Sequence, residues 1–161
     1  MQVFKNLLSQ ESLTQLKDIM ALEIQHHTNP EVPKYQSFMD MHTKYTEGLV
    51  RDLILDITQK VNIHYKGEYE PFHCWFNFVD DTSDSLGEEG FHTHTDTDVV
   101  AVFYVLNCTN HGTIIKVNEA RMQLLIEDNS LAIFDGTIDH AIPNWNGRDR
   151  YSVALDFKRV K

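Results

Sequence analysis

The stretch FHTHTDTDVVAVFYV, residues 91–105, most strongly limits what this chain can fold into, because it joins metal-binding side chains directly to a buried strand. The metal-binding side chains of its first part are His92, His94, Asp96 and Asp98. All of them share one parity, so an extended backbone would direct them to the same face. The residues that follow are apolar without interruption, as in a core strand. We therefore expect a metal site where this strand begins.

The composition is that of an ordinary globular chain. With 161 residues, 42% of them hydrophobic, it is expected to form a single domain over residues 1–161. No apolar run approaches the roughly 20 residues that a membrane-spanning helix needs. The first residues, MQVFKNLLSQ, show no secretory signal, which predicts a cytoplasmic protein. Cys74 and Cys108 are accordingly expected to be small buried thiols without a function of their own.

The charge balance bears on the partners of this chain. The formal net charge is −10 at pH 7, whereas a protein that binds a nucleic-acid backbone normally presents a basic patch. We therefore expect a small-molecule or peptide substrate, with no nucleic acid and no membrane as a partner. The segment 80–90 is acidic and contains glycines. It is expected to be an exposed loop, with a lid over the site as the alternative.

The first third of the chain has helical periodicity. Residues 9–27 carry an apolar stripe at Leu13, Leu16, Met20 and Ile24, with Ser9 and Ser12 available as caps. A second helix is predicted at about 45–62, with Leu49, Val50, Leu53, Ile54, Ile57 and Val61 as its stripe. The helical part of the domain therefore covers about residues 1–65.

From about residue 70 to residue 158 the pattern changes to that of short strands. Strands are predicted at 72–79, 91–95, 98–106, 112–117, 121–126, 130–134, 138–142 and 150–158. Many short strands that follow helices favour a barrel or a two-sheet jelly roll, with the helices packed on its outer face. The predicted fold class is therefore mainly β with N-terminal helices.

The last predicted strand has two faces of different character. Its large apolar side chains are Tyr151, Val153, Leu155 and Phe157, and they alternate with Arg150, Ser152, Ala154 and Asp156. One face should pack in the core while the other lines something polar. An arginine and a serine two residues apart on an inner face suit a carboxylate that is held by charge-assisted hydrogen bonds.

A possible metal-binding set emerges from the order of these residues. His94 and Asp96 form an H-x-D pair, and His140 follows just after an apolar strand. Two imidazoles and one carboxylate make a facial triad, which leaves three adjacent positions of Fe(II) open for other ligands. Arg150 lies 10 residues beyond His140 in the sequence.

This pattern resembles the 2-oxoglutarate and Fe(II)-dependent oxygenases, whose core is a double-stranded β-helix, a cupin-like jelly roll. The resemblance covers about residues 72–158 and includes a W-x-N strand with Trp75 and Asn77. It is greatest to a group of small 2-oxoglutarate oxygenases common in bacteria and their phages. The resemblance implies Fe(II) as cofactor, 2-oxoglutarate and O₂ as co-substrates, and succinate and CO₂ as products. The implied reaction is hydroxylation of an amino acid, a peptidyl side chain or a small metabolite.

The same resemblance assigns the residues of the site. It places His94, Asp96 and His140 on the metal and Arg150 with Ser152 on the far carboxylate of 2-oxoglutarate. Tyr104 is a further candidate for that carboxylate, because it shares parity with His94 if the strand has no bulge. The residues expected near the substrate are His92, Asp98, Trp145 and Arg148.

Two other interpretations of the residues stay open. A cupin-like metal protein would use His92, His94, Asp98 and His140 as ligands and would not need Arg150. A non-catalytic jelly-roll binding module would make the metal-type residues incidental. Metal binding and the role of Arg150 discriminate among the three interpretations.

Overall fold

The computed structural model describes residues 1–25, 35–79, 91–107, 113–141 and 149–160. Its antiparallel strands form a six-stranded sheet, in the order β1-β7-β4-β9-β3-β2, and a three-stranded sheet, in the order β6-β5-β8. The strands are β1 (Gln2–Lys5), β2 (Tyr35–Gln36), β3 (Tyr69–Val79), β4 (Val99–Asn107), β5 (Ile114–Val117), β6 (Ala120–Gln123), β7 (Ser130–Asp135), β8 (Asp139–Ala141) and β9 (Arg150–Arg159). The helices are α1 (Gln10–Gln25), α2 (Met41–Lys44) and α3 (Gly48–Tyr65). The predicted jelly-roll class is confirmed.

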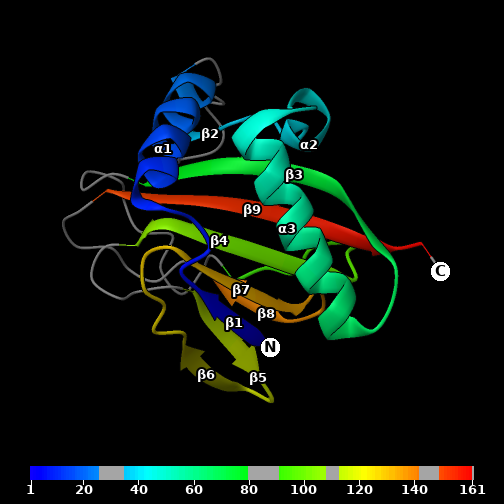
Figure 1. Cartoon of the computed structure of the whole chain (residues 1–161). Coiled ribbons are helices and arrows are strands. Elements are labelled where there is room, and N and C mark those ends of the chain that lie inside the picture. The colour runs from blue at the N-terminus through cyan, green and yellow to red at the C-terminus, as the bar shows by residue number, and fades with distance from the viewer. Residues whose placement is uncertain (26–34, 80–90, 108–112, 142–148, 161) are drawn as a thin grey trace.

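The uninterrupted apolar run of β4 is explained by burial on both of its faces. Val99, Ala101 and Phe103 belong to one hydrophobic cluster, which they share with the helices. Val100, Val102 and Tyr104 belong to a second cluster, which they share with residues of β5 and β7. Helices α1 and α3 cover one side of the large sheet, and the small sheet lies on its other side (Figure 1).

Strand β9 lies between β4 and β3 in the middle of the large sheet, and its two faces differ as predicted. Val153, Leu155 and Phe157 pack into the cluster beneath the helices. The alternate positions are also buried, but they carry polar or small side chains, namely Arg150, Ser152, Ala154 and Asp156. A sheet face with buried polar groups of this kind needs partners for them. The site is therefore expected on this face.

Both predicted helices are present. In α1 the predicted stripe is buried, and the Ser9 hydroxyl accepts a hydrogen bond from the Ser12 backbone N–H at 3.1 Å as an N-terminal cap. Helix α3 begins at Gly48, which has a φ of 77°, three residues later than predicted. It ends where Lys66 adopts a left-handed conformation and the Gly67 N–H bonds to the Asn62 carbonyl. No described helix is long and apolar enough to cross a membrane.

The structure differs from the prediction in the short elements. The expected strand at 91–95 is absent, and this segment makes only an isolated bridge at His92. Strands β1 and β2 and helix α2, each of two to four residues, were not predicted. Cys74 is a buried free thiol, as expected. Cys108 and the acidic segment 80–90 lie outside the described residues.

Gly136 allows the turn after β7 to approach the segment that precedes β4. Its N–H donates to the Asp98 carbonyl at 2.9 Å. A Cβ atom at this position would lie 2.1 Å from the Thr97 carbonyl oxygen, which is far inside van der Waals contact. A side chain here would therefore displace residues 94–98, which carry His94.

We expect Gly136→Ala to lower the free energy of unfolding by about 3 kcal/mol, the upper end for overpacking, because the obstacle is backbone. Gly48→Ala is the matched control, since Gly48 has a φ of 77° and nothing within 4 Å of its Cβ position. It should cost only about 1–2 kcal/mol of conformational strain. Urea denaturation of the metal-free proteins measures both values. An equal cost at the two positions would contradict the proposed close approach.

Candidate metal centre

His92 and His140 are brought together by the backbone. The His92 N–H donates to the His140 carbonyl and the His140 N–H donates to the His92 carbonyl, each at 3.0 Å. This is a hydrogen-bonded antiparallel pair, so the two side chains leave the bridge on the same face. Their ring centroids lie 4.6 Å apart. The pairing joins residues 48 positions apart, so no local pattern in the sequence indicated it.

His94 is placed by a turn and by a buried carboxylate. The Thr97 N–H bonds to the His94 carbonyl at 3.3 Å, which closes a four-residue turn. The His94 Nδ1 lies 2.5 Å from Oδ1 of Asp156 on β9. One side of the His94 ring faces His92, with the ring planes 14° apart, and Trp75 of β3 lies 5.6 Å away between centroids. His94 therefore lies between the polar face of the large sheet and the histidine pair.

These three histidines form a cluster that is suited to a metal ion. One ligand nitrogen from each of His92, His94 and His140 lies within 4.8 Å of the other two. The His140 Nδ1 donates to the Ile138 carbonyl at 2.9 Å, which leaves its Nε2 lone pair for a ligand. Burial lowers the pKa of His140 to about 4, so the imidazole is neutral at pH 7.

Asp96 and Asp98 lie elsewhere, and the expectation that four side chains of equal parity share a face is wrong. Asp96 has a φ of 63° within the turn, so the backbone there is not extended. Its side chain is exposed, and it is not part of the histidine cluster. The Asp98 carboxylate accepts a hydrogen bond from the Arg159 backbone N–H at 2.7 Å. Of the ligands expected by the cupin-like interpretation, the cluster therefore contains the three histidines and not Asp98.

Arg150 and Ser152 line the same cavity as the histidines. Both side chains are buried, and the Arg150 guanidinium donates to the Ser152 hydroxyl at 3.5 Å. The guanidinium carbon lies 5.2 Å from the centre of the Tyr104 ring. The Tyr104 hydroxyl makes a short hydrogen bond with the hydroxyl of Thr113, a cavity-lining residue. Tyr104 thus packs against Arg150, and the pairing of β4 with β9 shifts register just after it.

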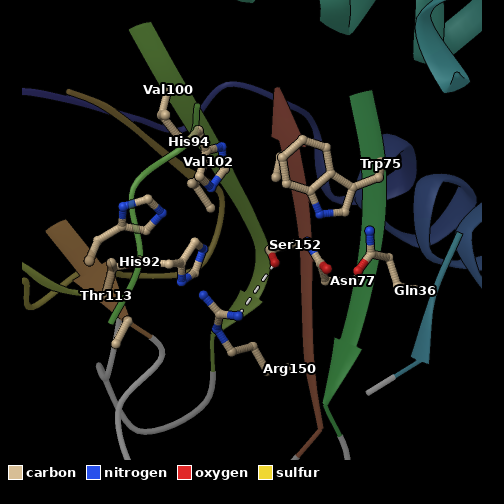
Figure 2. A pocket seen from close by; sticks show the side chains of 13 residues that line it. Gln36, Trp75, Asn77, His92, His94, Val100, Val102, Thr113, Arg150 and Ser152 are labelled. Atoms are coloured by element: carbon tan, nitrogen blue, oxygen red, sulfur yellow. Dashed lines mark hydrogen bonds between the residues drawn. The ribbon is translucent and has the colours of Figure 1, made fainter. Parts of the chain in front are cut away.

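The cavity has a volume of about 200 Å³ and lies on the polar face of the large sheet. Figure 2 shows the imidazoles on one side of it and Trp75, Asn77 and Gln36 on the other, with Ser152 and Arg150 between them. The W-x-N strand accounts for Trp75 and Asn77, whereas Gln36 comes from the two-residue strand β2 and was missed. Trp145 and Arg148 lie outside the described residues.

The fold is similar to that of solved enzymes. An oxidoreductase of the 2OG-Fe(II) oxygenase family from Burkholderia pseudomallei matches 94% of this chain and 80% of its own length, with a TM-score of 0.69 and 12% identity. HygX from Streptomyces hygroscopicus, solved with nickel and 2-oxoglutarate bound, matches 98% of this chain and 82% of its own, with a TM-score of 0.72 and 8% identity. A prolyl-4-hydroxylase from Pseudomonas putida matches 99% of this chain and 92% of its own, with a TM-score of 0.66 and 15% identity.

Similarity at the level of sequence is much weaker. No family model matches the chain, and no curated protein is significantly similar to it. The identities of 8–15% to the three solved structures are too low to carry site residues from one protein to another. What the chain shares with these solved proteins is their fold.

Proposed function

We propose that this protein is a 2-oxoglutarate- and O₂-dependent Fe(II) oxygenase that hydroxylates its substrate and releases succinate and CO₂. The observation that carries the proposal is the meeting, in one cavity, of a three-histidine cluster with a buried arginine and serine. The first group suits a metal ion and the second suits a carboxylate. The shared fold supports the combination, since HygX was solved with 2-oxoglutarate and a metal in place.

The proposed metal ligands are His92, His94 and His140. His92 therefore takes the place that the H-x-D pattern gave to Asp96. The hydrogen bonds at Nδ1 of His94 and of His140 leave the Nε2 atoms of these rings available to a metal, so the donor set fits the ion. Imidazole nitrogens suit iron, but they also suit zinc, copper and nickel. Three histidines therefore do not identify the metal as iron. The buried Arg150 beside them favours a 2-oxoglutarate oxygenase over a cupin-like metal protein, because only the oxygenase needs it.

The proposed co-substrate anchor is Arg150 with Ser152. A guanidinium and a hydroxyl two residues apart on β9 can bind one carboxylate through charge-assisted hydrogen bonds, which are stronger inside a buried cavity than in water. We propose that Tyr104 holds the guanidinium in place from the side and does not itself bind the carboxylate. A cupin-like metal protein would not need this anchor.

When they are bound, iron, 2-oxoglutarate and O₂ would supply the oxidising chemistry, with O₂ as the oxidant. The chain holds the co-substrate at a fixed distance from the histidines, and Val100 and Val102 form an apolar wall that excludes water. Gln36, Trp75 and Asn77, opposite the histidines, are the proposed contacts of the primary substrate. A cavity of about 200 Å³ suits an amino acid, a peptidyl side chain or a small metabolite. The prolyl-4-hydroxylase of Pseudomonas putida, which shares this fold, is named for a reaction at a prolyl group, and this supports a substrate group of that size.

The ligand set predicts a specific pattern of metal binding. His92→Ala, His94→Ala and His140→Ala should each weaken anaerobic Fe(II) binding by more than about 10-fold, because each removes one of three ligands. Asp96→Ala is the matched control and should bind Fe(II) as the native chain does. Equilibrium dialysis with metal analysis measures the affinities. Loss of Fe(II) binding in Asp96→Ala, with binding retained in His92→Ala, would instead support the H-x-D pair of His94 and Asp96 as ligands.

The co-substrate anchor predicts a separable defect. Arg150→Ala should keep Fe(II) but bind 2-oxoglutarate about 100-fold more weakly, since two charge-assisted hydrogen bonds contribute about 1.5 kcal/mol each. The visible absorption band of the anaerobic complex with Fe(II) and 2-oxoglutarate reports this binding. Arg121→Ala, at an exposed position on β6, is the control and should leave it unchanged. Equal 2-oxoglutarate affinity in the two variants would favour the cupin-like interpretation.

Turnover tests the reaction class. The native protein with Fe(II), O₂ and 2-oxoglutarate should form succinate, slowly alone and faster with the correct member of a panel of amino acids and peptides. His140→Ala should form none above the rate without protein. If the folded native protein binds Fe(II) and 2-oxoglutarate but forms no succinate with any member of the panel, the oxygenase reaction is excluded for these substrates. Such a result would favour a binding protein over an enzyme.

A further inference from the structure

Asp156 is a buried carboxylate on the cavity side of β9. It lies opposite His73 of β3 and Val100 of β4, in the same alternating set as Arg150 and Ser152. Only 3% of the residue is exposed. Its side chain contacts two histidines. Oδ1 lies 2.5 Å from Nδ1 of His94, and Oδ2 lies 3.4 Å from Nδ1 of His73.

The contact with His94 fixes which nitrogen of that ring faces the cluster. A carboxylate accepts hydrogen bonds, so His94 carries its proton on Nδ1 and keeps the lone pair on Nε2. The backbone at His94 belongs to a turn, which by itself leaves the ring free to rotate about its side-chain bonds. The strand that carries Asp156 is held on both sides by β3 and β4. The hydrogen bond therefore ties a ligand on a turn to the most constrained part of the sheet.

The charge of Asp156 also bears on the metal. A set of two histidines and one carboxylate contributes one negative charge to the ion, whereas three neutral imidazoles contribute none. Asp156 places a carboxylate one hydrogen bond away from the ligand His94, in a buried position where water screens it little. Three neutral histidines together with this carboxylate thus carry the same single net negative charge as two histidines and a carboxylate. The negative group contacts the ligand His94 and does not contact the metal itself.

We propose that Asp156 is the positioning residue of the metal centre: it orients His94 for metal binding and supplies the negative charge that the three-histidine set lacks. The inference rests on the proposed metal ligands. In this arrangement the carboxylate of Asp156 binds one nitrogen of the His94 imidazole, and the other nitrogen binds the metal. The carboxylate comes from the central strand β9 and not from the segment that carries His92 and His94.

His73 offers a matched control, because it contacts the other oxygen of the same carboxylate. Its side chain is 42% exposed and its distance to Asp156 is longer. His73→Ala removes a contact of Asp156 without touching the bond to His94. If Asp156 acted only by stabilising the strands, both of its histidine contacts would matter for the same reason. If Asp156 acts through His94, only loss of the contact with His94 should lower the affinity for the metal.

The test is anaerobic titration with Co(II), whose visible spectrum reports the ligand field as well as the affinity. Asp156→Asn keeps the size of the side chain and one acceptor oxygen but removes the charge, and Asp156→Ala removes both. We expect the Co(II) dissociation constant to rise about 10-fold in Asp156→Asn and up to about 100-fold in Asp156→Ala, with an altered spectrum. His73→Ala should stay within about threefold of the native protein. In a His94→Ala background, Asp156→Asn should have no further effect.

The contradicting results are distinct. Native Co(II) affinity in Asp156→Asn and Asp156→Ala, or an equal loss with and without His94, would overturn the inference and leave the metal site standing. A native protein that binds no Co(II) and no Fe(II) would overturn the proposed function, and this inference with it. If the Asp156 variants do not fold, ¹⁵N NMR of the histidine-labelled native protein still decides. The metal-free His94 ring should carry its proton on Nδ1, and a proton on Nε2 would overturn the proposal.

Discussion

The alternation of side chains along β9 is the constraint on which the rest of the structure depends. Every second residue of this central strand is large and apolar and packs under the helices, and the residues between them are buried but polar or small. A one-residue slip in register would place the charged set in the hydrophobic core, at a cost of several kcal/mol. The pairing of β9 with both neighbours thus fixes where Arg150, Ser152 and Asp156 lie, and with them one wall of the cavity.

The opposite wall depends on contacts that are distant in sequence. The backbone bridge between His92 and His140 ties the segment before β4 to β8, and Gly136 lets the turn after β7 approach Thr97. Each histidine is held by a different hydrogen-bonding contact. His92 is held by the backbone bridge, His94 by the carboxylate of Asp156, and His140 by a backbone carbonyl at its Nδ1. A site held by several independent contacts keeps its geometry before the metal binds, which favours affinity because little ordering remains to be done.

Those parts of the fold that have a local periodic signal could be predicted from the sequence. The stripes of α1 and α3 and the two faces of β9 are of this kind. The expectation that His94, His140 and Arg150 share one site came instead from the resemblance to a known family, and all three line the cavity. Which of the four candidate side chains at positions 92–98 lie together could not be predicted. A single residue in a left-handed conformation, Asp96, changes the direction of the chain there. The contacts of His92 with His140 and of His94 with Asp156 depend on register between distant strands, which no short pattern encodes.

In the proposed centre, three histidines and the carboxylate of Asp156 do the work expected of two histidines and a carboxylate. Crystals grown without oxygen in the presence of Fe(II) and 2-oxoglutarate test this most directly. We expect an ion bound by nitrogen atoms of His92, His94 and His140, with the far carboxylate of 2-oxoglutarate on Arg150 and Ser152. An ion bound by Asp96 or Asp98, or 2-oxoglutarate bound away from Arg150, would contradict it.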